Sequence, residues 1–174
     1  HAEVNCLEQV DEIPNDAVLY VTLEPCSTTG KTGACTELIL RRGIQKVVVG
    51  CLDPNPNHAG KGIDLLQDSG VHTIVGVCET EAVDLIKPFA KRMLEGRPYI
   101  TLKLGITLDG RIADSDGVSQ WITGPEAREE VQALRRRVDA VMVGAGTVRA
   151  DNPSLLPRPD EGRRPWRVIV GSDI

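Results

Sequence analysis

The chain has 174 residues, enough for one ordinary domain or for parts of two. Hydrophobic residues make up 41% of it and charged residues 26%, as in globular proteins, but aromatic residues only 3%, so Val, Ile and Leu must build the core. The net charge of −5 argues against general nucleic-acid binding and against an anionic membrane surface, and no apolar run reaches transmembrane length.

The first part of the chain alternates helical patterns with apolar runs of strand length. Strands are predicted at 17–23, 46–51 and 71–78. Helices are predicted at 1–10, 35–42, 62–70 and 79–96. This alternation predicts an α/β fold in layers, with a largely parallel sheet.

Gly96 and Pro98 end the last of these helices, and we predict a domain boundary there. The domains are then 1–96 and 97–174.

In the second region, two strand-like runs within 99–114 flank a predicted turn at Asp109–Gly110. A helix is predicted over 124–137, where proline stands in the first turn and acidic residues precede basic ones. A buried strand within 139–148 runs into a glycine-containing turn, and another strand begins at residue 166.

Five cysteines are an odd number in a chain too long to need disulfide staples. They favour a reducing compartment such as the cytoplasm, with cysteines as ligands or buried thiols. Cys6, Cys51 and Cys78 are expected to be small buried residues of helices and strands. Since the sequence opens with His-Ala-Glu-Val and not with Met, we expect it to be partial or processed.

The strongest chemical pattern combines His1, Glu3, Cys26 and Cys35. One imidazole and two thiolates make a three-ligand zinc site with the fourth tetrahedral position left for water, whose pKa zinc lowers towards neutrality. Glu3, two residues from His1, could carry protons between that water and a substrate nitrogen. Zinc deaminases show this arrangement as His-x-Glu followed by Pro-Cys-x-x-Cys, with Glu as general acid/base.

The spacing matches this signature only in part, because eight residues separate the two cysteines instead of two. The alternative is a pair of buried or disulfide-forming cysteines with an incidental terminal histidine. The order of His-x-Glu, Pro-Cys and the second Cys around a strand favours the zinc site.

Three stretches carry a family resemblance: VTLEPCSTTGKTGACT, DPNPNHAGKGIDLLQDSG and RPYITLKLGITLDGRIA. They resemble the bifunctional riboflavin-biosynthesis deaminase/reductase family, and the similarity extends from His1 through VGAGTVRADNPSLLPR. The resemblance implies a cytidine-deaminase-like zinc domain followed by part of a dihydrofolate-reductase-like domain, in a fragment lacking both ends. It also implies a homodimer through the reductase domain.

The family's first activity removes an amino group from a diaminopyrimidinone that bears a ribosylamino 5'-phosphate. The resemblance gives Glu3 the proton-transfer role and places Lys31, Asp53 and Asn55 at the substrate. Asp53 and Asn55 would equally suit a simple turn, and the two interpretations are compatible. Many family members have His where this sequence has Thr28.

The family's second activity reduces the ribosyl group to ribityl with NADPH. By resemblance, the NADP-contacting positions are Gly105, Trp121, Thr147 and Asp151. The substrate-contacting positions are Ser119, Arg135, Leu155 and Arg158. A guanidinium can pair bidentately with a phosphate, which agrees with the two arginines. Taken alone, Arg135 to Arg137 would be interpreted as a solvated helix face, and Trp121 would suit core packing equally well.

Two rival functions remain open from the sequence. One is a reductase whose zinc domain has only a structural role, which Thr28 favours. The other is a deaminase of nucleic-acid bases, which would carry the same signature residues. The acidic charge and the scarcity of aromatic residues for stacking argue against it, so we expect a small-molecule substrate and neither nucleic-acid nor membrane partners.

Overall fold

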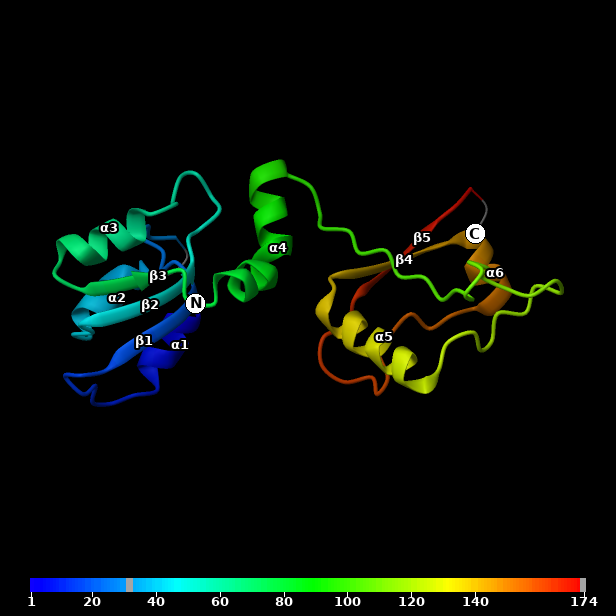
Figure 1. The fold of residues 1–174 in the computed structure, drawn as a ribbon, viewed down its shortest axis with the longest axis horizontal. Helices are drawn as coiled ribbons and strands as arrows, with labels where there is room; N and C mark the ends of the chain where they lie inside the picture. Colours follow the sequence, from blue (N-terminus) through cyan, green and yellow to red (C-terminus); the bar gives the residue numbers. More distant parts are fainter. Residues whose placement is uncertain (31–32, 173–174) are drawn as a thin grey trace. The chain divides into compact units, whose positions relative to one another are not determined.

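The computed structural model describes residues 1–30 and 33–172, and the chain divides into two units, His1–Thr101 and Leu102–Ile174. Each unit has its own parallel sheet, β1–β2–β3 in the first and β4–β5 in the second (Figure 1). The units part at Thr101, whereas the sequence places the boundary at Gly96. Within these ranges, no helix combines the length and apolarity needed to cross a membrane.

The first unit contains every helix and strand that the sequence predicts for it. Its strands are β1 (Val18–Leu23), β2 (Lys46–Cys51) and β3 (His72–Val75). Its helices are α1 (Ala2–Glu8), α2 (Cys35–Arg41), α3 (Lys61–Asp68) and α4 (Glu79–Glu95). The central strand β2 is buried from Val47 to Cys51, on both faces, as its continuous apolar sequence requires. The α/β prediction with a parallel sheet is therefore confirmed.

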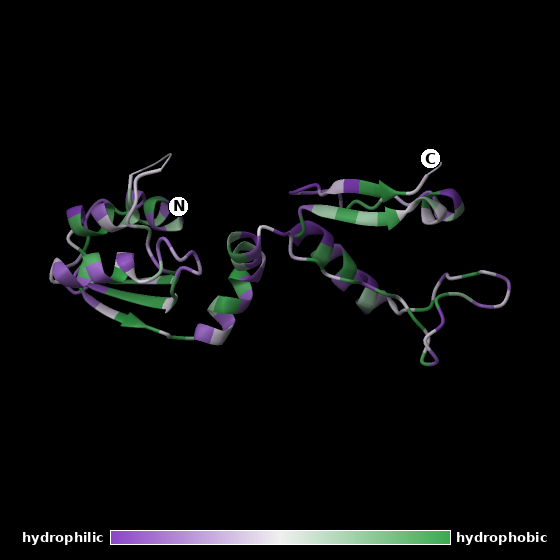
Figure 2. Ribbon diagram, turned by 90° about the horizontal axis from the view of Figure 1, so that it is seen from above, coloured by the Kyte–Doolittle hydropathy of each residue, from purple (hydrophilic) through white to green (hydrophobic). Residues whose placement is uncertain are grey.

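Helices cover both faces of this sheet. Leu7, Ile39 and Leu66, from α1, α2 and α3, share one core with Val47 and Val49 of β2. On the opposite face α4 packs against β2 and β1. The three layers follow from the alternation along β2, where successive side chains point to opposite faces. Figure 2 shows the strands as green hydrophobic bands, while the helices alternate between green and purple.

The second unit contains α5 (Pro125–Arg137), β4 (Ala140–Gly144), α6 (Ala145–Asp151) and β5 (Trp166–Val170). The predicted helix over 124–137 is confirmed, and so are the predicted strands within 139–148 and from residue 166. Helix α6 was not predicted, because Gly144 and Gly146 suggested a turn. Gly144 instead caps the helix in an extended conformation, and the residues that follow form two helical turns.

The predicted strands within 99–114 are wrong, although the turn between them is confirmed. Gly110 has a positive φ of 79°, and the amide of Thr107 donates to the carbonyl of Arg111 at 2.9 Å. The flanking residues are irregular, and the apolar side chains of Leu102 and Leu108 are exposed to solvent. A strand requires a neighbour for its backbone N–H and C=O groups, and no described strand pairs with this segment.

Gly50 lies where α4 meets the sheet, and replacing it with alanine tests this contact. A Cβ at Gly50 would lie 2.6 Å from the Cβ of Ala82 and 2.7 Å from the carbonyl oxygen of Thr22. We expect Gly50→Ala to lower the free energy of unfolding by about 1–3 kcal/mol, because overpacked cores must shift backbone. Urea unfolding would measure this. Gly30→Ala is the control, since no heavy atom lies within 4 Å of its added Cβ, and equal effects of both changes would contradict the packing.

Candidate functional site

Three side chains from distant parts of the sequence meet at the carboxyl end of β1. The Nδ1 atom of His1 lies 3.1 Å from the Sγ of Cys35 and 3.4 Å from the Sγ of Cys26. The three ligand atoms all lie within 4.8 Å of one another. His1 precedes α1, Cys26 follows β1, and Cys35 begins α2, so the folding of the layers brings them together.

Backbone hydrogen bonds fix Cys26 against the start of α2. The amide of Cys35 donates to the Sγ of Cys26 at 3.3 Å. The amide and the hydroxyl of Thr36 both donate to the carbonyl of Cys26, at 3.2 and 3.3 Å. An N–H directed at a sulfur stabilises it as a thiolate, which is the form that binds metals.

Burial raises the pKa of the Cys35 thiol to about 12, with contributions from its hydrogen bond to Cys26 and from the negative charge of Glu3. Cys35 is fully buried, whereas His1 is exposed and Cys26 is intermediate. The Glu3 carboxylate, in the first turn of α1, thus lies close enough to influence the cluster. A divalent cation bound here would instead lower the pKa of the Cys35 thiol, because the metal binds the thiolate and displaces the proton.

The residues present fit zinc by their chemistry. Two sulfurs and one imidazole nitrogen, gathered within a few ångströms, are the donor set of a zinc site with three protein ligands. Cys51 is buried as expected, with its thiol donating to the carbonyl of Thr22 at 3.4 Å. The expectation that Cys6 and Cys78 are buried is wrong, because each stands at an exposed helix position.

The predicted substrate residues Asp53 and Asn55 lie in a loop that follows β2. The Oδ1 of Asp53 accepts from the amide of Asn55 at 2.8 Å, and the Oδ1 of Asn55 accepts from the amide of Asn57 at 3.0 Å. These are the local bonds of Asx turns, so the turn interpretation holds. The ends of the loop are held by Glu24, to which sequence analysis gives no role. Lys31 lies outside the described residues.

In the second unit, Arg135 lies close enough to Arg158 for their charges to interact, while Leu155 is buried. The Nη1 of Arg135 donates to the carbonyl of Leu156 at 3.1 Å. Burial lowers the pKa of the Arg135 guanidinium, and the positive charge of Arg158 lowers it further. Two neighbouring guanidinium groups, one of them partly buried, create a local preference for an anion.

Ser119 and Trp121 line a cavity of about 360 Å³ together with Thr107, Asp109 and Arg111. The guanidinium carbon of Arg128 lies 4.5 Å from the centroid of the Trp121 ring, at cation–π distance. The indole is 70% exposed, so it is not the core residue that sequence alone would suggest. The sequence does not single out Arg128, because a helix pattern does not show which aromatic ring a cationic side chain contacts.

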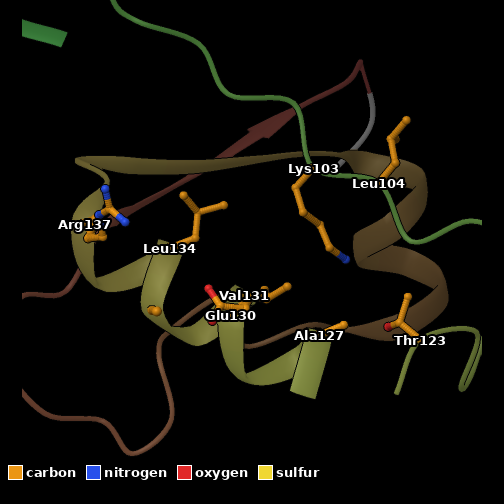
Figure 3. A pocket seen from close by; sticks show the side chains of 9 residues that line it. Lys103, Leu104, Thr123, Ala127, Glu130, Val131, Leu134 and Arg137 are labelled. Atoms are coloured by element: carbon orange, nitrogen blue, oxygen red, sulfur yellow. The ribbon is translucent and has the colours of Figure 1, made fainter. Parts of the chain in front are cut away.

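A second cavity, of about 410 Å³, lies along α5 (Figure 3). Lys103 and Leu104 line it from the irregular segment, and Ala127, Val131 and Leu134 line it from the helix. A Cβ on Gly105 would lie 3.6 Å from the Nζ of Lys103. The other predicted NADP residues, Thr147 and Asp151, are exposed on α6. Among the described residues, no hydrogen bond joins any two of the four predicted NADP residues, Gly105, Trp121, Thr147 and Asp151.

Comparison with known proteins finds a separate family match for each of the two units. Residues 1–51 match the model of the cytidine and deoxycytidylate deaminase zinc-binding region, and residues 98–174 match that of the RibD C-terminal domain. Riboflavin biosynthesis protein RibD of Aquifex aeolicus is 47% identical over 176 residues, covering 100% of this chain and 49% of that protein. Its Escherichia coli counterpart is 47% identical over 185 residues, covering 99% and 50%.

Solved structures give the same result. Acinetobacter baumannii RibD matches with a TM-score of 0.84 and 43% identity, over 97% of this chain and 49% of that one. A Thermotoga maritima protein, described as a diaminohydroxyphosphoribosylaminopyrimidine deaminase/5-amino-6-(5-phosphoribosylamino)uracil reductase, matches with a TM-score of 0.81 and 45% identity, over 88% and 44%. The chain thus spans about half the length of the curated relatives it matches.

The fold and the His–Cys–Cys cluster define a cytidine-deaminase-like zinc region joined to a RibD C-terminal region. The similarity runs through both regions and over nearly the whole chain. The chain is therefore similar, over nearly its whole length, to a section of the RibD proteins that contains parts of both regions.

Replacing Cys35 with alanine tests the metal cluster directly. We expect Cys35→Ala to lose the bound zinc, because two ligands bind far less tightly than three. Elemental analysis of the purified protein measures the zinc content per chain. Cys6→Ala is the matched control, since Cys6 is exposed on α1 and belongs to no cluster in the described residues. Retention of zinc in Cys35→Ala would remove Cys35 from the ligand set.

Proposed function

We propose that this chain acts in riboflavin biosynthesis as a bifunctional enzyme. Its first unit deaminates a diaminopyrimidinone bearing a ribosylamino 5'-phosphate, and its second unit reduces the ribosyl group to ribityl with NADPH. The observation that carries the proposal is the cluster of His1, Cys26 and Cys35 with Glu3 beside it, in a chain whose second half matches the RibD C-terminal domain. The descriptions of the relatives support the same pair of activities.

For deamination, His1, Cys26 and Cys35 would hold one zinc ion, which supplies a water activated near neutral pH. Glu3 would accept a proton from that water and deliver it to the departing amine nitrogen. Its place in the first turn of α1, within electrostatic range of Cys35, suits that role. Water replaces the amino group as a carbonyl oxygen, and ammonia leaves.

Asp53 and Asn55 would form one wall of the substrate pocket. Both are partly buried in a loop whose backbone is fixed by their own side chains. Their carboxylate and amide groups can recognise the amino and carbonyl edge of a pyrimidinone. Lys31, in the loop between the two cysteines, would meet the same substrate.

For reduction, Arg135 and Arg158 would bind the ribose phosphate, with Ser119 and Leu155 also at the substrate. The lowered pKa of Arg135 supports this assignment, because a phosphate would stabilise the charge that burial and Arg158 disfavour. Gly105, Trp121, Thr147 and Asp151 would hold NADPH, which supplies the hydride. The exposed indole, hydroxyl and carboxylate in this set fit stacking and hydrogen bonding to a nucleotide.

We further propose a cytoplasmic enzyme that dimerises through the second unit and binds neither nucleic acid nor membranes. The net charge of −5 and the scarcity of aromatic residues support the absence of a nucleic-acid partner. Both substrates are small, phosphorylated molecules.

Glu3→Gln tests the deaminase proposal in the full-length protein. We expect zinc to be retained and the rate of deamination to fall at least about a hundredfold, as is typical when a general acid/base is removed. Mass spectrometry without NADPH would follow conversion of the amine to a carbonyl. Glu8→Gln, at the exposed end of the same helix, is the control. A wild-type protein that reduces separately supplied deaminated substrate, yet never deaminates, would favour a purely structural zinc unit.

Arg135→Gln tests the phosphate site of the reductase. We expect the KM for the deaminated substrate to rise about tenfold or more, because a charge-assisted contact to the phosphate is lost. NADPH oxidation would be followed by absorbance. Arg137→Gln removes an exposed charge from the same helix turn and should leave KM nearly unchanged. An equal rise in both variants would indicate general electrostatic attraction and not a specific contact.

A further inference from the structure

The carboxylate of Glu24 is buried between the end of β1 and the candidate metal ligand Cys26. Only 5% of the residue is exposed, and it is the only Asp or Glu in the described ranges that is buried. An ionised carboxylate removed from water is strongly destabilising unless hydrogen bonds or opposite charges compensate it. The surroundings of Glu24 must therefore supply that compensation.

Three backbone amides provide it. The Oε2 atom accepts from the amides of Asp53 at 3.0 Å and Gly60 at 2.9 Å, and the Oε1 atom accepts from the amide of Gly62 at 2.8 Å. Asp53 and Gly60 are the two ends of the loop 53–60. A single carboxylate thus closes this loop and joins it to the first turn of α3.

Two glycines, Gly60 and Gly62, allow the backbone to come this close to the carboxylate of Glu24. Gly60 adopts a positive φ of 82°, which favours glycine, and its amide points to Glu24. At Gly62 an added Cβ would lie 2.1 Å from the carbonyl oxygen of Pro25 and 3.1 Å from the Oε1 of Glu24. The start of α3 therefore packs directly on the carbonyl of Pro25, in the peptide that joins Pro25 to Cys26, and on the side chain of Glu24.

We propose that Glu24 is a positioning residue of the deaminase site, which holds the loop 53–60 in register with the metal ligand Cys26. Its backbone leads directly to Cys26, and its side chain fixes the loop that carries Asp53 and Asn55. Glu24 thereby sets the separation between the pocket wall and the reacting centre. The inference rests on the proposed deaminase function, because that function gives the loop its role.

Glutamine at position 24 has nearly the same shape but cannot accept at both ends of its side chain. Its NH₂ group would face at least one of the three amide donors, leaving that donor buried without an acceptor. An NH₂ group in the place of Oε2 leaves the amides of Asp53 and Gly60, the two ends of the loop, without an acceptor, and one in the place of Oε1 leaves the amide of Gly62 at the start of α3 without one. The metal ligands themselves lose no bond in this variant, since Cys26 is fixed independently by Thr36 and Cys35.

The test compares Glu24→Gln with wild type in the full-length protein, using zinc content, deaminase kinetics and amide hydrogen exchange. We expect one zinc per chain and faster exchange at the amides that face the new NH₂ group, either Asp53 and Gly60 or Gly62. We also expect a rise in KM for the diaminopyrimidinone of about tenfold to a hundredfold, the effect of losing a charge-assisted hydrogen bond. The value of kcat should change less than KM. Glu12→Gln, an exposed carboxylate of the same unit, makes the same chemical change and should alter none of these readouts.

Glu24→Asp keeps the charge on a shorter side chain, and it should restore part of the KM if accepting hydrogen bonds is what matters. Unchanged KM and exchange in Glu24→Gln would overturn the inference. So would a loss of zinc in both Glu24 variants, because Glu24 would then support the whole metal unit and not the loop. If the wild-type protein itself does not deaminate, the proposed function fails instead, while hydrogen exchange still reports whether Glu24 holds the loop.

Discussion

The hydrogen bonds from Thr36 to the carbonyl of Cys26 are the contact on which the metal centre depends. Thr36 is fully buried, and its amide and hydroxyl both reach the same oxygen. They join the end of a strand to the first turn of a helix, which places the thiols of Cys26 and Cys35 side by side. His1, the residue before α1, completes the cluster with its Nδ1 atom. Because Thr36 is buried and its bonds join two secondary-structure elements, the fold sets the positions of the two thiols, independently of the exposed His1.

The layout of the first unit could be predicted from sequence because its signals are local. Continuous apolar runs predict the three strands, and Gly43, Gly70 and Gly96, all with positive φ, end the helices where expected. The burial of single residues could not be predicted in the same way. Cys6 and Cys78 lie on a helix and at a helix cap, but face solvent, whereas the charged Glu24 is buried. Burial depends on which elements pack together, and a one-dimensional pattern does not contain that information.

In the second unit the same reasoning succeeded for α5, β4 and β5 and failed for 99–114. Alternating apolar residues there indicate strand propensity, but a strand also needs a partner for its backbone groups. Helix α6 shows the opposite error, since its glycines suggested a turn where the chain continues as a helix. Individual site residues were named by family resemblance, and the structure adds their surroundings: Arg158 beside Arg135, and Arg128 over Trp121.

Each unit contains one group whose charged form is disfavoured, Cys35 in the first and Arg135 in the second, and the two groups would be stabilised by ligands of opposite charge. Burial raises the pKa of the Cys35 thiol, so the thiolate is disfavoured until a cation approaches. Burial and Arg158 lower the pKa of the Arg135 guanidinium, so its charge is favoured by an anion. Perturbed pKa values cluster at sites of binding and catalysis, where a ligand supplies the missing opposite charge. A cation at Cys35 in the first unit and an anion such as a phosphate at Arg135 in the second are the charges that would stabilise the ionised forms of these two groups.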